Sequence, residues 1–245
     1  MLLLSNASTL FGQVDANALF EQANEFYQQK RYTQAAETYE KILDSNQKSA
    51  DLYYNLGNAY YKNKQLGKSI LNYERALRLM PQHEDALYNL SIAQAERIDE
   101  IENLPPFFLS AWWNNLSSIA SSTIWGLLAI ILLWLSAGGW ATWFLGKTRE
   151  LKKKGFLVGL TALAVAILPF AFAFSQSQQE KNSNAAIIIS KEINLHSGPD
   201  ATSTPLNQLH EGTKLLLEDT IGDWWQIRLG NGEKGWVNQS GVEKI

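Results

Sequence analysis

The 245-residue chain contains no cysteine, only three histidines and only 18% charged residues. The absence of cysteine excludes disulfides, thiolate nucleophiles and cysteine-ligated metal sites. The net charge of −3 argues against a basic nucleic-acid-binding protein, so no nucleic acid is expected as a partner. An ordinary soluble domain has about a quarter of its residues charged. The shortage of charge therefore indicates a membrane protein.

The charges are concentrated in the two ends of the chain. Residues 1–104 carry a net charge of −4, residues 105–180 carry +3, and residues 181–245 carry −2. Between Glu102 and Lys147 there is no charged residue. This pattern predicts two acidic domains that flank an apolar middle segment.

Two uncharged runs in the middle segment, residues 123–145 and 155–174, are predicted to be transmembrane helices. At 1.5 Å per residue they extend about 34 and 30 Å, enough to cross a hydrocarbon core of about 30 Å. The alternative, two buried core helices, is disfavoured because both runs are long and uncharged. Pro169 is predicted to kink the second helix.

The segment between these runs, residues 146–154, is predicted to be a basic cytoplasmic loop. An excess of lysine and arginine marks the cytoplasmic side of a membrane protein. Both flanking domains then lie in the periplasm, if the membrane is a bacterial inner membrane. Alternatively the cluster is only a solvated loop and carries no information on orientation. The basic residues are Lys147, Arg149, Lys152, Lys153 and Lys154.

Three further segments flank the predicted hairpin or open the chain. Residues 105–122 alternate apolar and polar side chains at helical spacing, which predicts an interfacial helix anchored by Trp112 and Trp113. Residues 175–184 are predicted to be a polar linker. Residues 1–15 start with a short apolar run, interpreted as the remnant of a signal peptide. The alternative is that no signal exists and the orientation is inverted.

Residues 16–104 repeat with a period of 34 residues. Units 16–49 and 50–83 align without a gap, so that Asn24 corresponds to Asn58 and Tyr39 to Tyr73. Small residues such as Gly57 are expected where two helices approach closely. The units resemble tetratricopeptide repeats. A third, partial unit, residues 84–104, contains a single helix that is expected to cap the stack.

The resemblance to tetratricopeptide repeats implies a concave groove that holds an extended peptide or a partner helix. Asn24 and Asn58 occupy the position where such repeats often bind a peptide backbone, and no core contact is expected for Asn58. Lys62 is the only clear cation beside them, so a carboxylate-binding clamp is not expected. Alternatively these residues only maintain the scaffold. The predicted groove residues are Phe20, Asn24, Tyr27, Tyr54, Asn58, Tyr61 and Lys62.

Residues 185–245 contain five short segments with strand patterns and turn residues between them, which predicts a small all-β barrel. The sequence NLHSGPD at 194–200, LHEGTK at 209–214, GDWWQIRL at 222–229 and GEKGWV at 232–237 together resemble a bacterial SH3 domain. Trp224 and Trp225 are predicted to face opposite sides of a strand. One is expected in the core, and the other on the surface as a contact for a peptide or a cell-wall glycan.

Two other features of this domain are interpreted structurally. The glycines of residues 230–235 fit a nucleotide-binding pattern but lie between two predicted strands, so Asn231-Gly232 is predicted to be a hairpin turn. His196 and His210 are expected to be surface histidines. With no paired catalytic carboxylates, no Ser-His-Asp set and no P-loop, the chain is predicted not to be an enzyme and to need no metal or cofactor.

The predicted fold class is a multidomain membrane protein with an all-α tetratricopeptide-repeat solenoid, a two-helix transmembrane hairpin and a small all-β SH3-like barrel. This order resembles the BatE-type proteins of the Bacteroides aerotolerance operon, including the stretch from Asp99 to Pro106. The resemblance implies a membrane complex with von Willebrand A-domain proteins and a MoxR-type ATPase, linked to oxidative-stress resistance. The predicted function is a non-enzymatic membrane-anchored scaffold or adaptor. The alternative is a cell-wall-binding sensor or accessory protein acting through the barrel.

Overall fold

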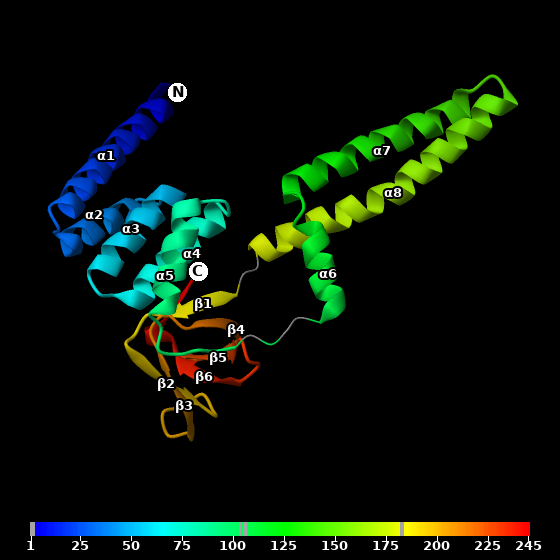
Figure 1. Ribbon diagram of the computed structural model, residues 1–245. Helices are drawn as coiled ribbons and strands as arrows, with labels where there is room; N and C mark the ends of the chain where they lie inside the picture. Colours follow the sequence, from blue (N-terminus) through cyan, green and yellow to red (C-terminus); the bar gives the residue numbers. More distant parts are fainter. Residues whose placement is uncertain (1–2, 103, 105–106, 182–183) are drawn as a thin grey trace. The chain divides into compact units, whose positions relative to one another are not determined.

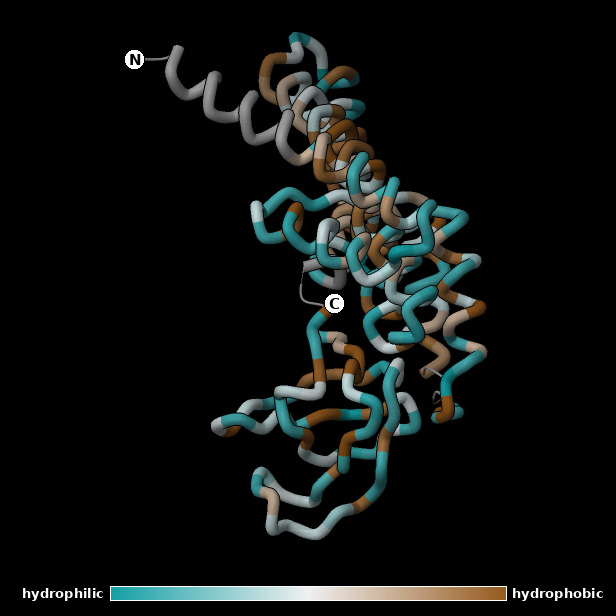
Figure 2. Tube along the Cα trace, turned by 90° about the vertical axis from the view of Figure 1, so that its left-hand side faces the viewer, coloured by the Kyte–Doolittle hydropathy of each residue, from teal (hydrophilic) through white to brown (hydrophobic). Residues whose placement is uncertain are grey.

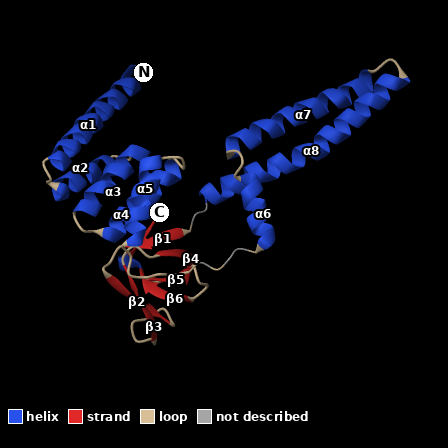
Figure 3. Cartoon of the chain, in the orientation of Figure 1, coloured by secondary structure: helices blue, strands red, loops and turns tan. Residues whose placement is uncertain are grey.

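The computed structural model describes residues 3–102, 104, 107–181 and 184–245 (Figure 1). The chain divides into two compact units. Unit 1 contains residues 1–104 and 184–245, and unit 2 contains residues 105–183. Within the described residues, strands occur only after residue 184 and all the rest of the regular structure is helical (Figure 3). The expected fold class is confirmed: helical repeats, a helical hairpin and an all-β domain.

Unit 1 begins with five helices, each packed against the next. In the turns after α1 and α3, Lys30 and Lys64 both adopt a positive φ of 62°, and they lie one repeat apart. The two complete units therefore share one backbone geometry as well as one sequence pattern. The helices are α1 (Leu3–Gln28), α2 (Tyr32–Asp44), α3 (Ala50–Lys62), α4 (Leu66–Leu79) and α5 (Glu84–Ala95).

The first fifteen residues are not a separate segment in the structure. Residues 3–15 form the beginning of α1, continuous with the helix of the first repeat. Met1 and Leu2 lie outside the described residues. The interpretation of this segment as a signal-peptide remnant stays a prediction.

Close helix packing inside the repeats requires small residues, as expected. A Cβ atom added to Gly57 would lie 2.7 Å from the ring of Tyr73 on the neighbouring helix α4. Such a distance is well inside van der Waals contact, so no larger residue fits at this position without movement.

The second part of unit 1, the β domain, contains seven strands rather than the five segments expected. Two of the predicted segments each fold into two strands, because Gly212 and Gly232 make turns with φ of +87° and +88°. The predicted turn at Asn231-Gly232 is confirmed. The strands are β1 (Ala185–Ile188), β2 (Glu192–His196), β3 (Pro205–His210), β4 (Lys214–Ile221), β5 (Trp224–Leu229), β6 (Lys234–Asn238) and β7 (Val242–Lys244).

All strand pairs of the β domain are antiparallel, in the order β3-β2-β6-β5-β4-β1-β7. Alternate residues point into one hydrophobic core, as expected for Leu215 and Leu217 on β4 and for Ile227 and Leu229 on β5. The tube in Figure 2 shows the same change between hydrophobic and hydrophilic residues along the strands.

The β domain packs directly against the end of the helical stack. Ile187 of β1 is fully buried in one cluster with Ile70 of α4 and Leu90 of α5. Ile189 and Ile245 pack against the same cluster. The lone helix α5 was expected to cap the repeats, but the β domain covers part of the same face.

The N-terminus of α4 is capped by a side chain from the β domain. The residue before the helix, Gln65, makes no side-chain cap hydrogen bond. Instead the backbone N–H of Gly67 donates to Glu211 Oε2 at 3.0 Å. A carboxylate at this position satisfies a free N–H group and interacts favourably with the helix dipole. Lys191 Nζ forms an ion pair with the other oxygen of this carboxylate, Glu211 Oε1.

Unit 2 consists of α6 (Phe108–Ser117), α7 (Ser122–Leu145) and α8 (Arg149–Lys181). Helices α7 and α8 form an antiparallel pair and are long and apolar enough to cross a membrane. Only 17% and 28% of their most apolar windows are buried, whereas the core helices of a soluble protein are mostly buried. The helices touch through small residues: a Cβ atom on Gly139 would lie 2.4 Å from the N atom of Gly159.

Helix α8 is longer than predicted at both ends. The loop between the spans is reduced to Gly146, Lys147 and Thr148, because Thr148 Oγ1 accepts a hydrogen bond from the N–H of Leu151 at 3.3 Å and so starts the helix. Most of the predicted basic loop 146–154 is therefore the first turn and a half of α8. The helix also runs through Pro169 and through residues 175–181 of the predicted linker. Residues 182–183 lie outside the described residues.

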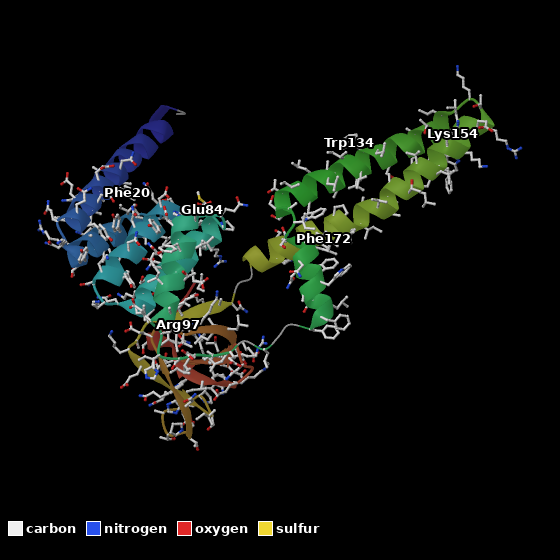
Figure 4. The ribbon with its side chains drawn as sticks, in the orientation of Figure 1. Phe20, Glu84, Arg97, Trp134, Lys154 and Phe172 are labelled. Atoms are coloured by element: carbon white, nitrogen blue, oxygen red, sulfur yellow. The ribbon has the colours of Figure 1, made fainter. Side chains whose placement is uncertain are left out.

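Helix α6 packs against the open end of the hairpin. Trp113 Nε1 donates to Ser175 Oγ at 3.2 Å, and its ring meets that of Phe172 at a centroid distance of 4.6 Å. Figure 4 shows Phe172 at this junction, far along α8 from Lys154. A helix is present, but it is shorter than the predicted segment 105–122, and only Trp112 of the two expected anchors is exposed. Its place at a membrane interface stays a prediction.

The contact between α4 and the β domain predicts an unusual effect of a small substitution. Gly67→Ala should favour the helix by about 1 kcal/mol through propensity alone. However, its Cβ would lie 2.5 Å from the carbonyl oxygen of Ile188. We expect the free energy of unfolding to fall by about 1–3 kcal/mol, measured by denaturant titration of the full chain in detergent.

Gly198→Ala is the matched control for this variant. A Cβ atom at Gly198 meets no described atom closer than 3.4 Å, which is an ordinary contact. Equal stability of the two variants would contradict the observed packing of α4 on β1.

Candidate functional site

A cavity of about 320 Å³ opens on the helical stack, between the first helices of successive units. Five of the seven predicted groove residues line it: Tyr27, Tyr54, Asn58, Tyr61 and Lys62. The structure adds Tyr73, Asn89 and Ile92. Alignment of the partial third unit could have indicated Ile92, because it lies one repeat after the predicted groove residue Asn58.

Phe20 and Asn24 lie outside this cavity. The ring of Phe20 packs edge-on against Tyr39 at a centroid distance of 5.8 Å. Asn24 Oδ1 accepts a hydrogen bond from the Tyr39 hydroxyl at 2.5 Å and one from Asn55 Nδ2 at 3.5 Å. Both residues therefore support the first repeat unit rather than the cavity.

Asn58 repeats this arrangement one unit later. Its Oδ1 atom accepts a hydrogen bond from the Tyr73 hydroxyl at 2.7 Å and one from Asn89 Nδ2 at 2.9 Å. Tyr73 is only 1% exposed, and burial raises the pKa of its hydroxyl, which stays protonated as a donor. The expectation that Asn58 makes no core contact is wrong, since its carbonyl group connects two helices of one unit with the next unit.

The surface that remains for a ligand is aromatic and amide in character. Among the described residues, Asn58 Nδ2 has no hydrogen-bond acceptor, so this donor is available on the cavity wall. The exposed Lys62 Nζ lies 5.9 Å from the ring centre of Tyr61. The Tyr61 hydroxyl donates to Glu96, and this hydrogen bond raises the pKa of Tyr61. One cation beside one carboxylate suits an extended peptide backbone better than a terminal carboxylate.

A larger cavity, of about 800 Å³, lies between α2, α3, α4 and the end of β7. An ion pair in this cavity connects the repeats to the β domain: Arg75 Nη2 lies 2.9 Å from Glu243 Oε1. Lys68 Nζ lies 4.9 Å from the ring centre of Tyr60. This cavity has no signal in the sequence, because it depends on the position of β7 against the repeats.

Trp224 and Trp225 are both half-buried, whereas one was expected in the core and the other on the surface. Trp225 packs against the β-domain core, with Lys244 Nζ 5.4 Å from its ring centre. Trp224 meets His196 edge-on at 5.2 Å. Neighbouring strands thus cover part of both rings, and a role in ligand binding stays a prediction.

The two histidines of the β domain are held by different partners. His196 Nδ1 lies 3.1 Å from the carbonyl oxygen of Ser203. His210 is not a free surface residue, because its Nδ1 atom lies 2.8 Å from Asp99 Oδ1. Within the described part of the chain, no three His, Cys, Asp or Glu side chains gather as a metal site.

The basic residues of the predicted cytoplasmic loop are exposed at the closed end of the hairpin. Lys154 is labelled there in Figure 4. Lys147 lies in the turn, and Arg149, Lys152, Lys153 and Lys154 lie in α8. The cluster is therefore compact and lies at one end of both apolar helices.

Comparison with known families identifies the modules of unit 1. Residues 23–64 match the model described as TPR repeat, residues 50–83 the one described as tetratricopeptide repeat, and residues 191–243 the bacterial SH3 domain. The chain thus contains tetratricopeptide repeats and a bacterial SH3 domain. A stretch of 52 residues is 40% identical to a protein of Bacillus subtilis (strain 168) with the name "Putative N-acetylmuramoyl-L-alanine amidase YrvJ". This stretch is 21% of the chain but only 10% of that relative.

The hydrogen bonds of Asn58 predict that two substitutions will behave differently. Asn58→Ala leaves the buried Tyr73 hydroxyl without its acceptor and should lower the free energy of unfolding by about 1–3 kcal/mol. Asn58→Asp keeps an acceptor for the Tyr73 hydroxyl and replaces the amide donor by a charged oxygen at a partly exposed position, so it should lose less stability than Asn58→Ala. Denaturant titration of both variants measures the difference.

Asn24→Ala provides the matched control. It breaks the equivalent bond to Tyr39 outside the cavity, so it should reduce stability similarly without affecting the cavity. If Asn58→Ala and Asn58→Asp lowered the free energy of unfolding equally, the hydrogen bond from Tyr73 to Asn58 would not be what stabilises the repeats.

Proposed function

We propose that this chain is a non-enzymatic adaptor, anchored in a membrane by α7 and α8. The observation that carries this proposal is the cavity of about 320 Å³ on the repeats, which presents the Asn58 amide among tyrosine rings. An extended segment can hydrogen-bond to such an amide while its side chains pack on the rings. The bacterial SH3 domain in the same compact unit supplies a second interaction module.

The order of the modules supports a closer relationship to the BatE-type proteins of the aerotolerance operon. On this proposal the partners are von Willebrand A-domain membrane proteins and a MoxR-type ATPase system. The complex would serve resistance to oxidative stress. The tetratricopeptide groove binds one protein partner, and the SH3 domain binds a second one.

We place the chain in a bacterial inner membrane, with the repeats and the SH3 domain in the periplasm. Support comes from the basic cluster Lys147–Lys154 at the closed end of the hairpin, because lysine and arginine favour the cytoplasmic side. Two membrane crossings return the chain to its starting side. Both parts of unit 1 then face the same compartment, as their direct contact requires.

Reporter fusions test this orientation. Alkaline phosphatase should be active when fused after Ile245 and inactive when fused after Arg149, because the enzyme matures only outside the cytoplasm. The opposite pattern would show that the repeats face the cytoplasm.

Site-specific crosslinking tests the adaptor function in native membranes. A photoreactive amino acid in place of Tyr61, on the cavity wall, should capture a von Willebrand A-domain protein. The same amino acid in place of Tyr88, which is exposed on α5 but does not line the cavity, is the control. If crosslinking is equally strong at Tyr61 and Tyr88, or absent at Tyr61, the proposal that a partner binds in the groove is contradicted.

The second candidate function is a cell-wall sensor or accessory protein. The similarity to YrvJ favours it, since the aligned stretch is about as long as the matched SH3 segment. Against it, residues 181–245 carry a net charge of −2, which disfavours binding to anionic wall polymers. The partly covered Trp224 and Trp225 also offer a sugar ring less flat aromatic surface than an exposed tryptophan would.

We therefore expect that the full chain in detergent does not sediment with purified peptidoglycan. The wall-sensor function would be favoured instead by strong co-sedimentation that Trp224→Ala removes. Trp113→Phe, in unit 2, is the control for changes in tryptophan content.

A further inference from the structure

The chain that leaves α5 lies along the β domain before it reaches unit 2. We call residues 98–104 the strap; residue 103 lies outside the described residues. The strap has no helix or strand in its described part, and its contacts are with the β domain. Arg97, at its start, is labelled beside the strands in Figure 4. The strap therefore sits on the barrel much as a bound peptide would.

Asp99 makes the most specific contacts of the strap. Its carboxylate accepts hydrogen bonds from the His210 backbone N–H at 2.7 Å and from Thr213 Oγ1 at 2.6 Å, and it lies 2.8 Å from His210 Nδ1. Thr213 is only 1% exposed, so this donor is built into the domain. Burial alone would raise the pKa of Asp99, but these hydrogen bonds hold its pKa below the usual range.

Two further positions complete the contact. Ile101 packs against the hydrophobic core of the β domain. The backbone N–H of Leu104 donates to the carbonyl oxygen of Gly230 at 2.9 Å. A Cβ atom on Gly232 would lie 3.0 Å from Leu104 Cδ1, so the glycine at this turn leaves room for the strap.

The residues beside Asp99 and Ile101 remain exposed at the rim of a cavity. Ile98 is 70% exposed, and Glu100 and Glu102 are exposed as well. Asp99 and Ile101 are thus partly buried on the domain, whereas their neighbours stay accessible to solvent. This alternation is typical of an extended peptide recognised along one side.

The strap fills its site incompletely. An open cavity of about 460 Å³ remains between the strap and Leu209, Leu229, Asn231 and Glu233 of the β domain. No Lys or Arg among the described residues lines it, whereas Glu100 and Glu102 lie there with Glu233. Like charges so placed repel one another. A segment with neutral or basic residues at these two positions would bind this surface more tightly than the strap does.

We infer that this surface of the β domain is a peptide-binding site that the strap occupies within the chain. Its external ligand is an extended partner segment with the pattern Asp-x-Ile-x-x-Leu and neutral or basic residues at the two x positions beside Ile. The inference rests on the proposed adaptor function of the β domain and adds the chemistry of the segment that it binds.

The strap competes with an external segment for the same surface of the β domain, and this competition sets the affinity that the external segment needs. A covalently attached ligand has an effective concentration in the millimolar range. A partner segment without the two strap glutamates avoids their repulsion with Glu233. This gain in binding free energy must be large enough to displace the strap. Release of the strap by substitution should make the site accessible to weaker ligands as well.

The test uses fluorescently labelled peptides and the full chain in detergent, with binding measured by anisotropy. The basic peptide Ile-Asp-Lys-Ile-Lys-Asn-Leu should bind the chain at least several-fold more tightly than the strap peptide Ile-Asp-Glu-Ile-Glu-Asn-Leu. Replacing its Asp by Ala should weaken binding about tenfold or more, as for the loss of charge-assisted hydrogen bonds. A scrambled basic peptide controls for attraction to the acidic chain.

Strap variants of the chain provide the second measurement. Asp99→Ala should increase the affinity for the basic peptide several-fold, because the strap no longer competes. Ile101→Ala should act in the same direction and replaces Asp99→Ala if that variant does not fold. The inference is overturned if the basic peptide binds no better than its scramble to the wild type and to a folded strap variant.

The peptide experiment and the crosslinking experiment can fail separately, so the two outcomes can be told apart. If a partner is captured at Tyr61 but no peptide binds, the strap site is rejected and the proposal for the groove still holds. Peptide binding without capture at Tyr61 would support the strap site and reject the groove.

Discussion

A short helical stack has to cover its last helices, and the rest of unit 1 depends on how this is done. Two complete repeats and one extra helix leave apolar residues of α4 and α5 without a following unit. The β domain buries Ile187 against this face and places Glu211 at the N-terminus of α4. The repeats and the SH3 domain therefore form one compact unit, although each belongs to a separate family. The strap and the cavity beside β7 both depend on this contact, whereas the groove is lined by repeat residues alone.

Local patterns predicted much of this molecule. The period of 34 residues located both repeats, because each unit must bury the same face against its neighbour. Gly57 was interpreted correctly, since close helix contact leaves a clear sequence signal. The two apolar helices were found from length and lack of charge alone. Their ends were less predictable, because Thr148 can cap a helix in a segment that also suits a loop.

Contacts between distant residues could not be predicted in the same way. Nothing in the sequence around Glu211 indicates that its partner is the N–H of Gly67, 144 residues away. Asp99 and Thr213 are separated by 114 residues, and their hydrogen bond depends on the fold of both parts. Asn58 lines the cavity on the repeats, but its hydrogen bond to Tyr73 was not predicted, because a polar residue in a groove was expected to contact only a ligand.

The path of the chain between its two units has a mechanical consequence. Both connections leave unit 1 from the β domain: Leu104 is bonded to Gly230, and the carbonyl of Asn184 accepts from the N–H of Leu217 at 2.8 Å. Tension that reaches unit 1 at Leu104 acts first on the hydrogen bond of Leu104 to Gly230 and next on the hydrogen bonds of Asp99. Bonds loaded one after another separate at a lower force than bonds loaded together. The strap would thus detach from the barrel before the load reached α5 and the repeats.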